Sequence, residues 1–230
     1  MQVSAKPSKQ RTEVRQASLV EAALRLAAQR SPADISTTDL AQAVGITQGA
    51  VFRHFANKEA IWLAALDWVT DTLMNRLHRA AQTALGELPA PADSLPASPA
   101  LVPEAPVNTH ALAALQAVFM AHVNFVVEHP GVPRVIFQEL QRPGDTALKA
   151  RVRSLMQQYR QLVAQLLAQA KATNKIALQA DLTSATVLFI GSIQGLVMQS
   201  LMSGDVAAMT RQAPGVYALF QRGLLAQAPL

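Results

Sequence analysis

The segment from Ser36 to Lys58, STTDLAQAVGITQGAVFRHFANK, constrains the fold more than any other part of the chain. Its first half predicts a short helix, because Ser36 or Thr37 can cap the helix start and apolar residues follow at helical spacing. Gly45 supplies the left-handed backbone position at which the chain reverses. Thr47 then caps a second short helix. Two short helices around a glycine turn predict a helix-turn-helix for DNA.

The second helix has the composition of a recognition helix. Ala50 and Val51 are left for packing, while small, amide and cationic residues face outward. A small residue permits close approach to a groove, an amide pairs with a base edge, and cations or hydroxyls hold phosphates. We therefore expect Thr38 and Thr47 at phosphates, Gln48 at a base edge, and Arg53 in either role. The complete set of residues predicted to lie at the DNA is Thr37, Thr38, Thr47, Gln48, Gly49, Phe52, Arg53, His54 and Lys58.

The run TTDLAQAVGITQGAVFRHFANKEAIW resembles the amino-terminal pattern of the TetR/AcrR family of bacterial transcriptional regulators, over about residues 11–70. The resemblance implies an all-helical homodimer with an amino-terminal DNA-binding domain and a divergent carboxy-terminal domain that binds a small molecule and dimerises. This chain departs from the family at Phe52, where relatives commonly have tyrosine, which favours packing or contact with a thymine methyl. Gln48 stands where relatives often have lysine, which favours base reading.

Composition places the chain among globular proteins of a reducing compartment. Half of its 230 residues are apolar, and it contains no cysteine, which excludes disulfides and thiolate metal sites. The net charge is +5, with a modest basic excess in the first 60 residues. The basic start lacks an apolar run, so we expect no signal peptide and no membrane anchor. A cytoplasmic location follows from these expectations.

Helical periodicity divides the chain into segments of different roles. No strand pattern extends over several elements, so the predicted fold is all-α with about nine helices. The expected helices are Glu13–Gln29, Asn57–Leu85, His110–Glu128, Val132–Gln141, Asp145–Thr173, Asp181–Met202, and a last one from Val206 or Pro214 to Leu225, besides the two of the motif. The expected divisions are a disordered basic arm at 1–10, the helix-turn-helix domain at 11–57, a connecting helix at 58–87, a proline-rich loop at 88–107, and a ligand-binding and dimerisation domain at 108–230.

The proline-rich loop holds six prolines between Leu88 and Pro106. We interpret it as a surface excursion between two helices, with a partner-binding segment as the alternative. Asp181–Met202 is apolar nearly all round, but its hydroxyl and amide residues favour a buried helix over a membrane span.

The family resemblance places the last two helices at a two-fold axis. Gly191 and Gly195 lie four residues apart, a spacing that lets a neighbouring backbone approach closely. We therefore assign to the dimer interface or its adjacent core Gly191, Gly195, Met198, Met202, Leu219 and Phe220. The alternative is that these residues form intrachain core only.

Reactive groups do not converge on an enzyme site. The sequence has no glycine-rich phosphate loop, no nucleophile elbow and no His-Glu-x-x-His helix. His122 and His129 share a helix face, but sparse carboxylates favour polar surface over a metal site. We expect no catalysis, no metal and no cofactor.

The carboxy-terminal half is the natural place for an effector. Apolar and aromatic residues on four helices could line a cavity or fill a solid core, and the family resemblance favours the cavity. The candidate ligand-binding residues are Phe119, His122, Phe125, Phe137, Met156, Tyr159, Phe189 and Ile193. Their few polar groups indicate an apolar or aromatic effector.

These patterns predict a ligand-responsive, sequence-specific transcriptional regulator. It would be a homodimeric repressor released from a pseudo-palindromic double-stranded operator by a small molecule. Binding chemistry does not fix the sign of regulation, so an activator is an alternative. A helical interaction protein or a small-molecule-binding protein without operator binding is another.

Overall fold

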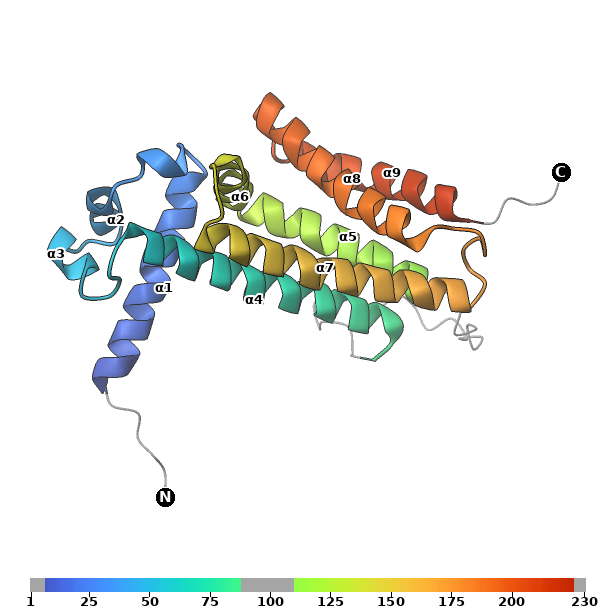
Figure 1. The fold of residues 1–230 in the computed structure, drawn as a ribbon, viewed down its shortest axis with the longest axis horizontal. Coiled ribbons are helices and arrows are strands. Elements are labelled where there is room, and N and C mark those ends of the chain that lie inside the picture. Colours follow the sequence, from blue (N-terminus) through green and yellow to red (C-terminus); the bar gives the residue numbers. More distant parts are fainter. Residues whose placement is uncertain (1–6, 88–109, 226–230) are drawn as a thin grey trace, which may run out of the picture. The chain divides into compact units, whose positions relative to one another are not determined.

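The computed structural model describes residues 7–87 and 110–225, and every regular element in those ranges is helical. The predicted all-α fold is therefore confirmed. The elements, labelled in Figure 1, are α1 (Pro7–Ala27), η1 (Pro32–Asp34), α2 (Thr37–Ala43), α3 (Gln48–Val51), α4 (Lys58–Leu85), α5 (His110–Glu128), α6 (Gly131–Gln141), α7 (Ala147–Ala172), α8 (Leu182–Ser203) and α9 (Ala208–Leu224).

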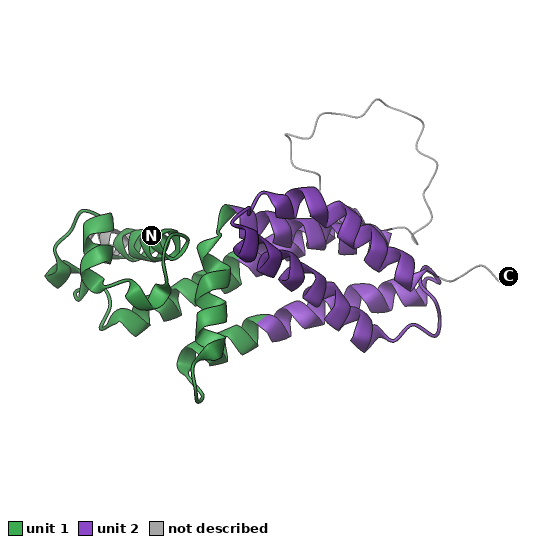
Figure 2. Ribbon diagram, turned by 90° about the horizontal axis from the view of Figure 1, so that it is seen from above, with its two compact units in different colours: residues 1–72, 128–155 green, residues 73–127, 156–230 purple. Residues whose placement is uncertain are grey.

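Two compact units are formed by segments that alternate along the chain (Figure 2). Unit 1 consists of residues 1–72 and 128–155, and unit 2 of residues 73–127 and 156–230. This division differs from the predicted one, since α6 and the start of α7 join the amino-terminal helices. Residues 1–6 and the proline-rich segment 88–107 lie outside the described residues.

The helix ends follow the local signals for the most part. Ser36 caps α2, Thr47 caps α3 and Asp181 caps α8, each accepting a backbone N–H of the first turn. Asn57 accepts the N–H of Ala60 at 2.8 Å at the start of α4. Gly204 ends α8 with a φ of 73°, in the left-handed region that glycine tolerates.

Several helix starts differ from the predictions, among them those of α1 and α9, both of which involve a proline. α1 begins at Pro7 rather than Glu13, so residues 7–10, predicted to belong to a basic arm, are helical. Proline is accepted at a first helical position because the N–H that it lacks would have no partner there. α9 begins at Ala208 and contains Pro214 within it, at the cost of one helical hydrogen bond.

Unit 1 is built on α1, which contacts η1, α2 and α6. Its core contains fully buried side chains from α1, α2, α3 and α4 and from the residue after η1, among them Leu19, Ile35, Leu40, Val51 and Ile61. Burying such aliphatic side chains stabilises a fold by about 1.5–3 kcal/mol each.

Gly131 brings α6 against α1 within this unit. A Cβ at this position would lie 2.0 Å from the carbonyl oxygen of Leu24 and 2.9 Å from the amide nitrogen of Ala28. Both atoms belong to the backbone, so neither can swing aside. Only glycine allows this approach.

Unit 2 has an aromatic core. Phe119, Tyr159, Phe189 and Tyr217 are almost fully buried, and the hydroxyl of Tyr217 donates to the carbonyl oxygen of Leu112 at 2.8 Å. α8 and α9 contact each other (Figure 1). α8 leaves Val187, Leu188, Met198 and Met202 exposed, and α9 leaves Leu219 exposed.

By length and composition alone, α5 and α8 could cross a membrane, which is weak evidence because core helices pass the same test. About half of the apolar window of each helix is buried in the protein. The buried rings of Phe119 on α5 and Phe189 on α8 account for part of this apolar character.

We predict that Gly131→Ala destabilises the protein by about 1–3 kcal/mol, the usual cost of overpacking a well-packed contact. Chemical denaturation monitored by circular dichroism measures the change. The matched control is Gly215→Ala, where a Cβ meets no atom within 4 Å. Equal stabilities for Gly131→Ala and the wild type would show that α1 and α6 do not depend on this contact.

Candidate nucleic-acid interface and helical core

The first helix of the motif is fixed by a capping box. The hydroxyl of Ser36 accepts the N–H of Asp39 at 3.1 Å, and the carboxylate of Asp39 accepts the N–H of Ser36 at 2.7 Å. Arg30 forms an ion pair with Asp39 at 2.9 Å. The hydrogen bonds from Ser36, together with Arg30, hold the pKa of Asp39 well below its ordinary range.

The turn and second helix follow directly. Gly45 has a φ of 69°, and the N–H of Ile46 returns to the carbonyl oxygen of Ala41 at 3.0 Å. α3 is short, but its hydrogen-bonding pattern continues to Phe55, whose N–H donates to the carbonyl oxygen of Val51 at 3.0 Å. Val51 is fully buried and anchors α3 in unit 1.

A hydrogen bond between two helix starts orients the predicted base-reading residue. Nε2 of Gln48 donates to Oγ1 of Thr37 at 2.9 Å, from the first residue of α3 to the first of α2. An amide has two N–H donors and one carbonyl oxygen. This bond therefore leaves Gln48 one donor and one acceptor, the pair that an adenine edge requires.

The two predicted phosphate-contacting threonines are exposed. The hydroxyl oxygen of Thr47 accepts the N–H of Ala50 at 3.3 Å, which caps α3. A hydroxyl that accepts a bond can still donate one, so Thr47 can cap the helix and donate to a phosphate.

Phe52 and Arg53 are exposed at the end of α3, and Phe52 is 49% accessible. A large apolar side chain that is half accessible has contact area available for an apolar group of a partner. Gly49 is also exposed, and a Cβ there would meet no atom within 4 Å. Gly49 is therefore not required by packing within the chain.

His54 and Lys58, both predicted to face the DNA, are partly occupied by burial or hydrogen bonds within the chain. Nδ1 of His54 is buried without a hydrogen-bond partner, and its backbone carbonyl accepts Nε2 of Gln16 at 2.9 Å. Nζ of Lys58 donates to the carbonyl oxygen of Ala33 at 2.9 Å. Burial lowers the pKa of Lys58.

Side chains of α1 also hold the motif, and the sequence analysis missed them. Besides Gln16, Arg15 donates to the carbonyl oxygen of Val44 and Arg25 to that of Ala43, each at 3.5 Å. These bonds join residues 18 to 38 positions apart, for which no spacing rule exists.

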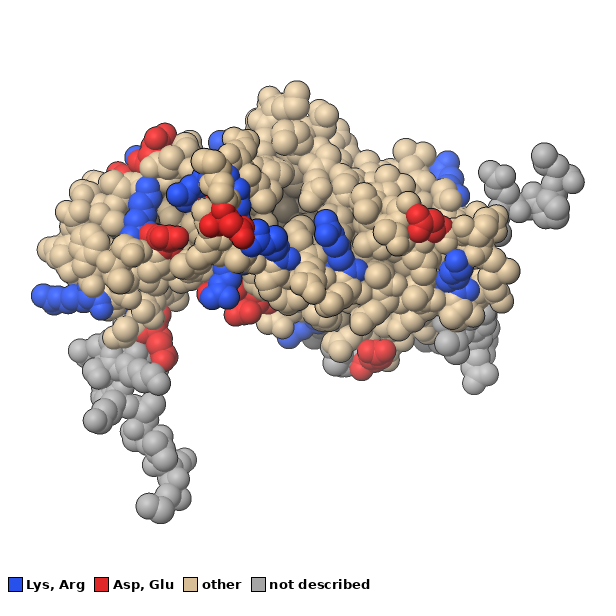
Figure 3. Space-filling model, in the orientation of Figure 1, with Lys and Arg blue, Asp and Glu red and all other residues tan. Residues whose placement is uncertain are grey.

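Charges of both signs share the surface. On the face drawn in Figure 3, Lys and Arg side chains are interspersed with Asp and Glu side chains. A mixed surface of this kind gives weaker non-specific attraction to phosphates than a single basic patch.

The predicted effector residues are arranged as a packed core in unit 2. Phe189 contacts Phe119 edge to face, with ring centroids 5.4 Å apart, and contacts Phe220 in the same way at 5.4 Å. Tyr159 contacts Phe189 at 6.4 Å. The rings expected to line a cavity therefore pack against each other.

The remaining predicted effector residues are divided between the units. Phe125 and Ile193 are fully buried and Met156 is partly buried, all in unit 2. Phe137, partly buried on α6, belongs to unit 1. The guanidinium of Arg76 lies 5.6 Å from the ring centroid of Phe125, a contact that the sequence analysis missed.

One polar pair lies within this aromatic region. Nδ1 of His122 and the hydroxyl of Tyr159 are 3.1 Å apart, and their rings meet edge to face at 5.1 Å. Burial lowers the pKa of His122 to about 4 and raises that of Tyr159. Both groups are therefore neutral near pH 7 and available as a hydrogen-bonding pair. Within residues 7–87 and 110–225, no group of three His, Asp or Glu side chains is placed to hold a metal ion.

The predicted dimer residues divide into an exposed group and a buried one. Gly191, Gly195, Met198, Met202 and Leu219 are exposed, and Met202 is 74% accessible. Phe220 is buried against Phe189 and belongs to the adjacent core.

Two family models match the chain. Residues 19–65 match the model of bacterial regulatory proteins of the tetR family, and residues 139–215 match that of the tetracyclin repressor-like C-terminal domain. Together the matches cover more than half of the chain. The chain belongs to the TetR family.

The following proteins are similar to this TetR-family chain at low sequence identity. It is 21% identical to the nucleoid occlusion factor SlmA of Alteromonas mediterranea over 188 residues, 82% of this chain and 84% of that protein. The fold resembles FadR from Bacillus subtilis in complex with stearoyl-CoA, with a TM-score of 0.69, 15% identity, and coverage of 90% of this chain and 98% of that one. It also resembles KstR2 of Mycobacterium tuberculosis, with a TM-score of 0.64, 19% identity, and 98% coverage of both chains. At such identities the likeness to these structures shows the fold alone.

The depressed pKa of His122 predicts an acid-sensitive regulator. The unfolded histidine binds a proton near pH 6.5, whereas the folded one binds it only near pH 4. The contribution of neutral His122 to the free energy of unfolding is therefore fully present above pH 6.5. It falls by roughly 1.4 kcal/mol for each pH unit between those values. His122→Gln should flatten this part of a denaturation profile measured from pH 7.5 to pH 4. The control is His110→Gln at the start of α5, and an unchanged slope in His122→Gln would contradict the assignment.

Proposed function

We propose that this TetR-family protein is a homodimeric repressor that binds a pseudo-palindromic operator and is released by a small apolar or aromatic effector. The TetR family establishes a DNA-binding transcriptional regulator, and family members typically bind operators and effectors as dimers. The single observation that carries the proposal is the oriented Gln48 amide at the exposed start of α3.

In the proposed complex, α3 enters the major groove. Gln48 reads a base edge with its free donor and acceptor, and Thr37 holds the amide in place. Thr38 and Thr47 donate to phosphates, Gly49 permits close approach, and Arg53 contacts a phosphate or a base. Phe52 contacts a thymine methyl, because its exposed ring has no hydroxyl to offer.

His54 and Lys58 have narrower proposed roles than the other DNA residues. His54 contacts the DNA backbone through Nε2, since Nδ1 is buried. Lys58 reaches a phosphate with an N–H that its bond to Ala33 leaves free, because an ammonium group has three donors.

The dimer is proposed to form through the exposed faces of α8 and α9. Met198, Met202 and Leu219 are 45%, 74% and 66% accessible, and Cβ atoms at Gly191 and Gly195 would meet nothing within 4 Å. A glycine inside a helix costs about 1 kcal/mol relative to alanine. Close approach of a partner backbone is a physical reason to retain both glycines. In a dimer, two recognition helices would meet successive major grooves.

The effector is proposed to bind among the aromatic residues of unit 2. Phe119, Phe125, Met156, Tyr159, Phe189 and Ile193 supply apolar surface, and His122 with Tyr159 supplies a neutral hydrogen-bonding pair. Phe137 lies on α6 in unit 1, outside this region, and its predicted effector role stays a prediction. The FadR structure of this fold contains stearoyl-CoA, a ligand with a long apolar chain, which supports an apolar effector. Because the rings now contact each other, a ligand must separate them, and this rearrangement can be coupled to DNA affinity.

Selection from a random duplex library at near-physiological salt tests the operator proposal. We expect the wild type to enrich a palindromic consensus and Gln48→Ala to lose preference at one position of each half-site, by about 1–3 kcal/mol. The control is Gln157→Ala, an exposed glutamine on α7. Equal losses by Gln48→Ala on operator and random DNA would refute base reading, and the absence of any motif would refute a sequence-specific regulator.

Sedimentation velocity tests the dimer. Met198→Glu would place two carboxylates near the two-fold axis, and like charges brought together cost several kcal/mol, so we expect monomers at micromolar concentration. Leu178→Glu is the control, because Leu178 is 68% exposed and lies outside α8 and α9. An unchanged dimer in Met198→Glu would place the interface elsewhere.

A further inference from the structure

Unit 1 contains a pocket of about 490 Å³ next to the helix-turn-helix. Its walls come from η1, the start of α4, α6 and the first turn of α7. The apolar part of the wall includes Pro32, Trp62, Val135 and Leu148, each less than one tenth accessible. This volume falls within the range of sites for small molecules.

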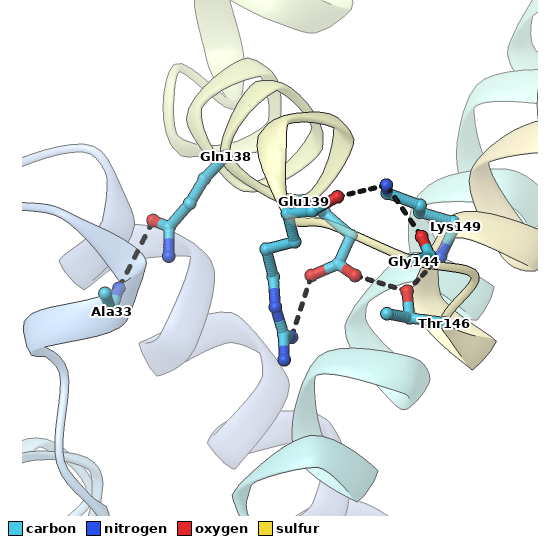
Figure 4. Close-up of polar contacts among 7 residues, drawn as sticks. Ala33, Gln138, Glu139, Gly144, Thr146 and Lys149 are labelled. Atoms are coloured by element: carbon cyan, nitrogen blue, oxygen red, sulfur yellow. Dashed lines mark hydrogen bonds and ion pairs between the residues drawn. The ribbon is translucent and has the colours of Figure 1, made fainter.

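Most polar groups of the wall have partners within the protein. Oε1 of Gln138 accepts the N–H of Ala33 and the hydroxyl of Ser31, each at 3.2 Å. The carboxylate of Glu139 accepts from Arg142 at 3.2 Å and from the hydroxyl of Thr146 (Figure 4). These bonds fix the shape of the wall and neutralise the buried carboxylate.

Among residues 7–87 and 110–225, no carboxylate forms an ion pair with the ammonium group of Lys58. Its bond to Ala33 is made with a neutral carbonyl oxygen, and Asp34 and Asp39 act on it only through space. Partial burial lowers its pKa, against the opposing effect of these two carboxylates. A carboxylate bound beside it would form a charge-assisted hydrogen bond, roughly twice as strong as a neutral one.

We propose that this pocket binds a small aromatic monocarboxylic acid, with its ring against Trp62 and Val135 and its carboxylate on Nζ of Lys58. An aromatic ring suits the indole because edge and face contacts add to the burial of apolar area. The exposed carboxylate of Glu59 at the pocket disfavours a second negative charge. The site is separate from the aromatic core of unit 2, which is the proposed effector region.

Binding here would also affect DNA, a consequence that rests on the proposed phosphate contact of Lys58. An acid that occupies the ammonium group competes with that phosphate. Loss of one phosphate contact lowers the salt dependence of DNA affinity by about one unit of slope. The acid would therefore weaken binding to operator and random duplexes alike.

Calorimetry on the full chain without DNA tests the site directly, with 1-naphthoate as the probe and 1-naphthamide as its neutral control. We expect saturable binding of the acid and about tenfold weaker binding of the amide, since a hydrogen bond to a charged group contributes about 1.5–3 kcal/mol. Lys58→Met should weaken the binding of 1-naphthoate by the same factor. Lys149→Met is the matched control, because its ammonium bonds the carbonyl oxygens of Arg142 and Gly144 (Figure 4) and does not line the pocket.

Nuclear magnetic resonance places the probe. The chain has two tryptophans, and we expect 1-naphthoate to shift the indole N–H resonance of Trp62 more than that of Trp68, which does not line the pocket. Ala33→Leu fills the pocket from the exposed side of η1 and keeps Lys58, so it should abolish binding while the circular dichroism spectrum stays unchanged.

Equal affinity for acid and amide, full binding by Lys58→Met or Ala33→Leu, or an unmoved Trp62 resonance would each overturn the proposal. None of these measurements contains DNA. A failed operator selection would therefore leave the pocket intact as a proposal, and an empty pocket would leave the operator proposal standing.

Discussion

The close approach of α6 to α1 at Gly131 is the contact on which unit 1 depends. It joins two segments that the sequence separates by about a hundred positions, and it does so through backbone atoms rather than adaptable side chains. Gln138 then bonds η1, and Glu139 bonds Thr146 before α7. The base of the DNA-binding helices is therefore built partly from residues far along the chain. A tightly packed contact between backbone atoms cannot deform continuously, so the two helices can change position only between discrete arrangements. Conformational switches depend on discrete arrangements of this kind.

Local signals predicted most of the secondary structure. Ser36, Gly45 and Thr47 each act on backbone groups within a few residues, so their roles follow from residue type and spacing. The predicted start of α1 was wrong because proline followed by polar residues is equally compatible with an extended arm and with a first helical turn. The two compact units group the helices differently from the predicted divisions, because periodicity shows where a helix lies but not which helices it contacts.

The candidate sites were predictable in composition and not in geometry. The residue types between Ser36 and Lys58 pointed to DNA, but the bonds from Gln48 to Thr37 and from Lys58 to Ala33 cross between elements. In unit 2, helical spacing identified buried aromatic residues. The same spacing fits a lined cavity and a filled core, and only coordinates show that Phe119, Phe189 and Phe220 touch. The glycines also show that residue type does not predict surroundings. A Cβ at Gly131 would clash with backbone atoms, whereas a Cβ at Gly191 would have no atom within 4 Å.

The hydrogen bond between Gln48 and Thr37 has a further consequence for recognition. A free glutamine side chain on a surface samples many rotamers, and ordering one costs up to about 2 kcal/mol of entropy. Here that ordering occurs when the protein folds, before any duplex is met. A reading group prepared in this way loses less freedom on binding, so more of its contact energy remains for telling one base pair from another. Thr37 would then influence sequence preference without touching a base, and changes at that position could redirect the protein to new operators.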